Sequence, residues 1–305
     1  MTPMLRQLRF AANNPSKTFN YLQQLCYDFY FSQIHNHNGV DFMSQDWDNL
    51  LLLDGCRYDL FKEANNLDGE LTPIQSPASE TDEFLEKTVG EKKFPGTVYF
   101  TANPQITKTK TKFHDIHHLW DELWDENLNT VHPAKLTDYV LDHVDDYPQK
   151  RLFVHFVQPH IPFIGPTGQR IDQSPFQGGV MSERSNKHDY IWNMLREGNI
   201  TKQTVWKAYR ENLKIGLQEA ERLVSELDGK TVITSDHGNS IGEWGIYGHA
   251  PNRHIESLTK VPWFERPTNE RKIITEGEVM SGIEMKNKDT TNRDVKDRLA
   301  ALGYR

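Results

Sequence analysis

Short apolar runs alternate with longer amphipathic stretches along most of the chain. The run NLLLLDG at 49–55 contains four consecutive leucines, too few for a helix and typical of a strand buried on both faces. We expect five strands, at 50–53, 97–101, 151–157, 230–235 and 261–264. Strands separated by helical stretches favour a mostly parallel sheet with crossover helices.

The stretches between these strands carry apolar residues at helical spacing. We expect helices at 79–89, 115–127, 134–145 and 202–227. The last is the longest, and its apolar stripe is predicted to lie in the core: Val205, Tyr209, Leu213, Leu217, Ala220 and Val224.

The chain divides into three parts by composition. Residues 1–45 are predicted to form an N-terminal helical extension, 46–267 the main domain, and 268–305 a polar tail that ends in a short helix with the sequence RLAALGYR. Within the main domain, 165–189 is rich in Gly, Pro, Gln and Ser and predicts a surface or substrate-facing insertion.

Composition and charge exclude several classes of protein. A length of 305 residues with 36% hydrophobic residues is enough for a sizeable core. The net charge of −8 argues against a nucleic-acid-binding protein. No apolar stretch approaches the roughly 20 residues needed for a transmembrane helix. The basic N-terminus has no apolar segment after it, and Cys26 and Cys56 form no CxxC pair, so we expect a cytoplasmic protein.

Polar residues with the chemistry of metal ligands follow two of the expected strands. Asp54 comes after the leucine run, and Asp236 and His237 come after the strand at 230–235. Ligands bind at the carboxyl ends of strands in open α/β sheets, so Asp54 and Asp236 are predicted to converge. Glycines at 238, 242, 245 and 248 supply turns that fold His249 back toward this edge.

A candidate nucleophile lies in SPASETDEFL at 76–85. Ser79 followed by Asp82 is a helix N-terminus pattern, so Ser79 is either a helix cap only or a hydroxyl placed in the positive field of the helix. Thr81 is the alternative nucleophile. His160, between Pro159 and Pro162, is presented from a stiff loop after the strand at 151–157.

Taken in their order along the chain, these motifs resemble those of archaeal-type proteins in the sulfatase-like branch of the alkaline phosphatase superfamily. Further matching segments are SDHG at 235–238 and HIESLTKVPWF at 254–264. The resemblance implies a three-layer α/β/α sandwich, with 46–267 as a sulfatase-like catalytic domain. It also implies that Asp54, Asp236 and His237 bind a divalent metal, that Ser79 attacks phosphorus or sulfur, and that His160 and His249 contact the ester or its leaving group.

One departure limits the resemblance. Sulfatases proper carry a Cys-x-Pro-x-Arg signature, whereas Cys56 here is followed by Arg57, Tyr58 and Asp59, so formylglycine chemistry is not expected. The arrangement is similar to that of phosphoethanolamine and lipoteichoic-acid transferase relatives, which use a threonine nucleophile at the position that aligns with Ser79. Histidine with carboxylates favours one Mn²⁺ or Zn²⁺ over Mg²⁺ or Ca²⁺.

The sequence therefore predicts a metal-dependent hydrolase or transferase of phosphate or sulfate esters. Its substrate is expected to be an anionic ester, which could be part of a glycan or of a lipid head group. The alternative is a catalytically silent metal-binding or glycan-binding member of the same fold.

Overall fold

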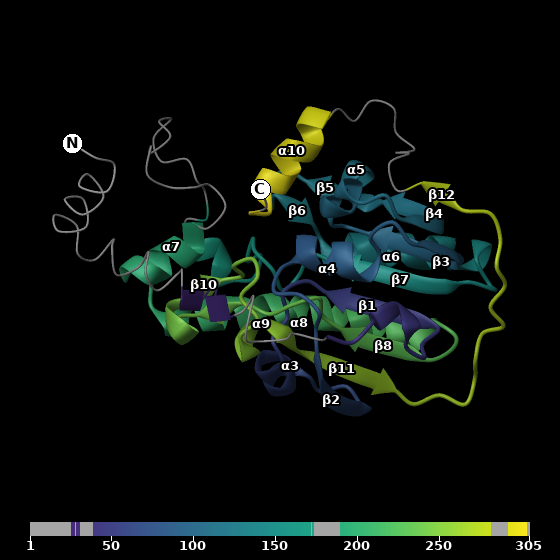
Figure 1. The fold of residues 1–305 in the computed structure, drawn as a ribbon, viewed down its shortest axis with the longest axis horizontal. Coiled ribbons are helices and arrows are strands. Elements are labelled where there is room, and N and C mark those ends of the chain that lie inside the picture. The colour runs from purple at the N-terminus through teal and green to yellow at the C-terminus, as the bar shows by residue number, and fades with distance from the viewer. Residues whose placement is uncertain are drawn as a thin grey trace.

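A computed structural model describes residues 26, 27, 29, 30, 39–171, 173, 190–281 and 292–303. Its centre is an eight-stranded sheet in the order β12-β4-β3-β7-β1-β8-β11-β2 (Figure 1). The five neighbouring strands from β4 to β8 run parallel, whereas β11, β2 and β12 pair antiparallel with their neighbours. The expected mostly parallel central sheet is confirmed.

The strands of this sheet are β1 (Asn49–Leu53), β2 (Glu70–Gln75), β3 (Lys93–Thr101), β4 (Lys112–His118), β7 (Arg151–Phe156), β8 (Thr231–Thr234), β11 (Lys260–Arg266) and β12 (Met280–Ser281). Two small antiparallel pairs lie outside it: β5 (Trp124–Asp125) with β6 (Thr130–Val131), and β9 (Ser240–Ile241) with β10 (Tyr247–Gly248).

The described α-helices are α3 (Tyr58–Ala64), α4 (Thr81–Thr88), α5 (Leu119–Glu122), α6 (Pro133–His143), α7 (Tyr190–Glu197), α8 (Lys202–Glu226), α9 (Glu256–Thr259) and α10 (Asn292–Ala301). Short 3-10 turns are η2 (Phe42–Ser44), η3 (Pro104–Lys108), η4 (Val144–Asp146), η5 (Gly168–Arg170) and η7 (Glu243–Gly245).

Helices cover both faces of the sheet, as two neighbouring residues of β11 show. Phe264 contacts Phe61 of α3, with ring centroids 6.0 Å apart. Trp263 points to the opposite face, where its ring lies 5.7 Å from Phe42, which packs against Phe84 of α4. Helix α8 packs against both α3 and α6 on the first face. The expected three-layer α/β/α arrangement is therefore confirmed.

The long helix and the central strand supply much of the core. All five residues of β1 are buried, because β7 and β8 flank the strand and helices cover both its faces. The predicted stripe of α8 is buried from Val205 to Ala220, while Val224 is half-buried at the end of the helix. None of the described helices has the length and apolar character needed to cross a bilayer.

The helix expected at 115–127 is wrong. Most of its first half belongs to β4, which pairs in parallel with β3, and only the single turn α5 follows. Ile116, Leu119 and Trp120 are spaced like the buried stripe of a helix, but pairing with β3 buries this segment as a strand instead. The half-exposed edge strand β2, which contains Pro73, also has no counterpart among the expected strands.

The remaining sequence expectations lie partly outside the described residues. Only 26, 27, 29, 30 and 39–45 of the expected N-terminal extension are described, and most of the insertion at 165–189 is not. In the expected tail, β12 joins the edge of the central sheet beside β4, and α10 begins at Asn292, before the RLAALGYR segment. The domain boundaries at 46 and 267 stay predictions.

Candidate functional site

Four of the parallel strands bring polar side chains to one edge of the sheet. Asp54 follows β1, Asp236 and His237 follow β8, His155 lies near the end of β7, and Asn103 follows β3. Parallel strands end at the same edge, so these side chains meet although they are far apart in sequence. The predicted convergence of Asp54 and Asp236 is seen directly, since Nε2 of His237 lies 3.6 Å from Asp54 Oδ1 and 3.5 Å from Asp236 Oδ2.

Asp236 is fully buried and held by hydrogen bonds. Its Oδ1 accepts from the backbone N–H groups of Gly55 and His237, each at 2.9 Å. Burial raises the pKa of Asp236, but the neighbouring His237 and His155 and the hydrogen bond from Gly55 outweigh burial and keep it below its ordinary value. The carboxylate is therefore ionised, with Oδ2 turned toward the other side chains of the cluster.

Thr81, the first residue of α4, places its hydroxyl inside this cluster. Its Oγ1 donates to Asp236 Oδ2 at 2.7 Å and lies 3.1 Å from His237 Nε2 and 3.4 Å from Asp54 Oδ1. The hydroxyl also lies at the N-terminus of the helix, where the backbone field favours negative charge.

Ser79 has different surroundings. The N-cap of α4 is Glu80 and not Ser79, so the cap position expected from the sequence is wrong by one residue. The Ser79 hydroxyl lies 3.0 Å from the carbonyl oxygen of Ala250 and 3.1 Å from Glu83 Oε2, and it accepts from the backbone N–H of Arg253 at 3.1 Å. These bonds join the start of α4 to the loop that follows His249.

Three imidazoles meet beside the carboxylates. The ring centroid of His249 lies 4.8 Å from those of both His160 and His237. His160 is fully buried, and His249 is half-buried. Burial and then the nearby His237 lower the pKa of His160 to about 4. Burial and both neighbouring imidazoles also hold the pKa of His249 well below its usual range, so both rings are neutral at neutral pH.

Two further residues of this cluster were not predicted from the sequence. Nε2 of His155 lies 3.9 Å from Asp54 Oδ2, its Nδ1 lies 2.7 Å from the Tyr99 hydroxyl, and Nε2 makes no hydrogen bond with any described residue. Asn103 donates from Nδ2 to Asp54 Oδ2 at 2.7 Å. The available signal for His155 is that it is the one polar residue within the apolar run LFVHFV of a buried strand.

The donor atoms fit a divalent metal ion. Oxygen and nitrogen atoms of Asp54, His155 and Asp236 all lie within 4.8 Å of one another. Nδ1 of His237 lies 2.8 Å from the carbonyl oxygen of Gly238, which can only accept, so Nδ1 carries the hydrogen and Nε2 is the nitrogen that faces the two carboxylates. Carboxylates with imidazole are ligands that Zn²⁺ and Mn²⁺ accept. The predicted ligand set is thus close together, with His155 as an additional donor.

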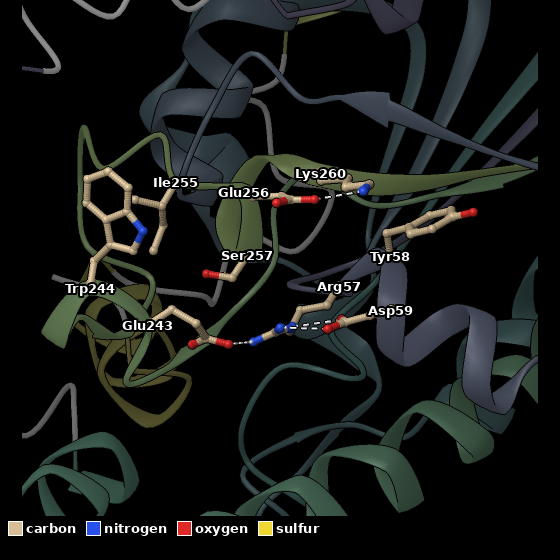
Figure 2. A pocket seen from close by; sticks show the side chains of 9 residues that line it. All are labelled: Arg57, Tyr58, Asp59, Glu243, Trp244, Ile255, Glu256, Ser257 and Lys260. Atoms are coloured by element: carbon tan, nitrogen blue, oxygen red, sulfur yellow. Dashed lines mark hydrogen bonds and ion pairs between the residues drawn. The ribbon is translucent and has the colours of Figure 1, made fainter.

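A cavity of about 510 Å³ lies apart from these site residues (Figure 2). Gly238 packs closely against two residues that line this cavity, because a Cβ at position 238 would lie 3.0 Å from Arg57 Cγ and 2.3 Å from the carbonyl oxygen of Ser257. Arg57 ion-pairs with Asp59 and Glu243 along one wall (Figure 2). The cavity is lined by Arg57, Tyr58, Asp59, Glu243, Trp244, Ile255, Glu256, Ser257 and Lys260 and by none of the predicted site residues.

No family model and no curated protein sequence matches the chain. Among solved structures, the chain is similar to the soluble domain of lipooligosaccharide phosphoethanolamine transferase A from Neisseria meningitidis, with 14% identity over 74% of this chain and 76% of that one and a TM-score of 0.45. It is also similar to a putative sulfatase from Bacteroides thetaiotaomicron, with 11% identity over 73% and 65% of the two chains and a TM-score of 0.41.

A third similar structure is a phosphonate monoester hydrolase from Silicibacter pomeroyi, with 12% identity over 83% of this chain and 72% of that one and a TM-score of 0.37. Each TM-score is below 0.5, so the side chains of this chain, and not the likeness, support its proposed function.

Proposed function

We propose that the protein is a metal-dependent hydrolase or transferase of phosphate or sulfate esters that forms a covalent intermediate on Thr81. One observation carries the proposal: Oγ1 of Thr81 lies within 3.4 Å of side-chain atoms of Asp54, Asp236 and His237. A hydroxyl among potential metal ligands and at a helix N-terminus is suited to act as a nucleophile. The surroundings of Ser79 offer it no such partners.

Asp54, Asp236 and His237 are the residues proposed to hold the metal, with His155 beside them. Two fully buried carboxylates are costly unless positive charge compensates them. A bound Zn²⁺ or Mn²⁺ would supply this charge and would favour ionisation of a nearby hydroxyl. The same charge would attract an anionic ester, so the proposed substrate is a phosphate or sulfate ester.

The remaining roles fall to residues of the chain itself. Oγ1 of Thr81 loses its proton and bonds to phosphorus or sulfur, the bond to the leaving oxygen breaks, and that oxygen takes up a proton and leaves as the alcohol. Water or a second alcohol then attacks the phosphoryl or sulfuryl group and releases it from Thr81. The proton that this water or alcohol loses must pass to a base. His160 and His249 are neutral and border the cluster, so they are proposed to accept that proton.

The test begins with protein stripped by a chelator and reloaded with Mn²⁺ or Zn²⁺. Bis-p-nitrophenyl phosphate, p-nitrophenyl phosphate and p-nitrophenyl sulfate are assayed with wild type, Thr81→Ala and Ser79→Ala. Metal-dependent cleavage that Thr81→Ala abolishes and Ser79→Ala retains would support the proposal. Intact-mass measurement after a rapid quench would detect the group bound to Thr81, and an added alcohol would separate transfer from hydrolysis.

The alternative is a metal-binding protein without turnover. The observation that favours it is the complete burial of Thr81 together with Asp54 and Asp236. Metal bound by the wild type with no cleavage of any of the three esters would support this alternative.

A further inference from the structure

Each of the three clustered imidazoles has its Nδ1 beside an oxygen atom. For His237 and His160 that oxygen is the backbone carbonyl of the following residue, at 2.8 Å. For His249 it is Oδ1 of the Asn239 side chain, at 2.9 Å. Any sequence would supply the two carbonyls, whereas the partner of His249 depends on the residue at position 239.

The orientation of the Asn239 amide follows from its other contacts. Asn239 is fully buried, and its Nδ2 donates to the carbonyl oxygen of Gly55 at 3.1 Å. Nδ2 also lies 3.4 Å from the hydroxyl oxygen of Tyr209, which donates its own hydrogen to Gly55. A flipped amide would place two acceptors against each other at Gly55. Oδ1 therefore faces His249.

The backbone holds both partners in register. In the small sheet, Gly248 pairs with Ser240 and Tyr247 with Ile241, so the next residue outward on each strand brings His249 opposite Asn239. Nη1 of Arg57, a residue that lines the cavity in Figure 2, donates to the backbone carbonyl of Asn239 at 3.1 Å. Asn239 is thus anchored at its side chain and at its main chain.

We infer that Asn239 is a positioning residue that sets the tautomer of His249. Oδ1 can only accept, so Nδ1 of His249 must carry a hydrogen, and Nε2 is the unprotonated nitrogen of the neutral ring. The catalytic consequence rests on the proposed function: only this tautomer can accept a proton at Nε2. The tautomer itself does not depend on catalysis.

The tautomer can be read by long-range ¹H–¹⁵N spectroscopy of histidine-labelled protein, in the metal-free and Zn²⁺-loaded states. His249→Gln identifies the His249 signals. We expect the Nδ1–H form in wild type and a shift toward the Nε2–H form in Asn239→Leu. In the same variant kcat/KM should fall by about 10- to 100-fold, the range typical when the hydrogen-bond partner of a metal-binding histidine is removed.

Two further variants test whether the Asn239 acceptor causes the tautomer of His249. Asn239→Asp keeps an acceptor opposite Nδ1 of His249, so the Nδ1–H form should persist. Its second carboxylate oxygen replaces the Nδ2 group that donates to Gly55, so this variant should also lower stability. Asn49→Leu removes another buried amide at the opposite end of β1, where Nδ2 donates to Asp228 O at 2.9 Å and Thr231 Oγ1 at 3.0 Å. It should lower stability and leave the His249 tautomer as in wild type.

An Nε2–H form of His249 in wild type would overturn the inference, as would an unchanged tautomer in folded Asn239→Leu. If Asn239→Leu does not fold, the inference is tested by the tautomer of His249 in wild type and in Asn239→Asp. Wild type that shows the Nδ1–H form and cleaves no ester would leave the positioning role supported while the proposed function fails.

Discussion

The hydroxyl of Thr81 lies 2.7 Å from Oδ2 of Asp236, across 155 positions of the chain. Helix α4 begins at Thr81, so its first residue points into the cluster at the ends of β1 and β8. The Ser79 hydroxyl, two residues earlier, lies 3.0 Å from a backbone carbonyl in a different loop. Two hydroxyls near one helix start therefore have different chemical surroundings.

The first prediction follows from that difference. Thr81→Ala should lower ester cleavage by at least about 10³-fold, because it removes the proposed covalent nucleophile. Thr81→Ser keeps a hydroxyl and should retain measurable turnover. Ser79→Ala should stay within about tenfold of wild type and cost on the order of 1 to 3 kcal/mol of stability through lost buried hydrogen bonds. The opposite ranking of the two alanine variants in kcat would assign the nucleophile to Ser79.

The second prediction concerns metal binding. Asp236→Ala should abolish both metal content, measured by elemental analysis, and ester cleavage, while circular dichroism shows a retained fold. His237→Gln should weaken metal binding more than His155→Gln. Nε2 of His237 lies 3.5 and 3.6 Å from two carboxylates, whereas that of His155 lies 3.9 Å from Asp54. Wild-type metal stoichiometry in Asp236→Ala would contradict the site.

The third prediction concerns the core. Leu213 of α8 is fully buried, and Leu213→Ala should lower the free energy of unfolding by about 2 to 5 kcal/mol. The adjacent Lys214 is exposed, so Lys214→Ala is the matched control and should change stability by no more than about 0.5 kcal/mol. Urea unfolding curves of both variants provide the measurement, and equal midpoints would mean that the stripe does not face the core.

The fourth prediction concerns acid stability. Burial raises the pKa of Glu83, but hydrogen bonds from His254, Lys87 and the backbone of Ser79 outweigh burial and lower it from 4.5 to about 2. Because the folded-state pKa lies below the ordinary one, ionised Glu83 stabilises the fold above about pH 4.5, and this contribution disappears as the pH falls through about 2.

Glu83→Gln removes this pH-dependent contribution, on the order of 2 kcal/mol after solvent screening. The free energies of unfolding of wild type and Glu83→Gln should therefore approach each other between about pH 5 and pH 2, as measured by urea unfolding. A gap that stays constant over this range would show that the carboxylate is not stabilised in the folded state.

Local patterns in the sequence were sufficient for several elements. The leucine run of β1 and the stripe of α8 have the periods of a buried strand and an amphipathic helix, and both elements are present with bounds close to those expected. The helix expected at 115–127 shows the limit of this approach. Its apolar spacing suits a helix, and only the pairing of residues 115–118 with β3, a segment distant in sequence, makes this part a strand.

The sequence by itself determined which residue types follow the strands, and hence that Asp54, Asp236 and His237 would gather at one edge, because parallel strands end together. Tertiary structure alone decided that Thr81 faces this edge while Ser79 does not, since the start of α4 and its rotation depend on packing against the sheet. It also brought His155 beside Asp54 and Asn239 opposite His249. Those relationships arise from strand register and from contacts between segments that are distant in sequence, and local patterns of apolar residues do not predict them.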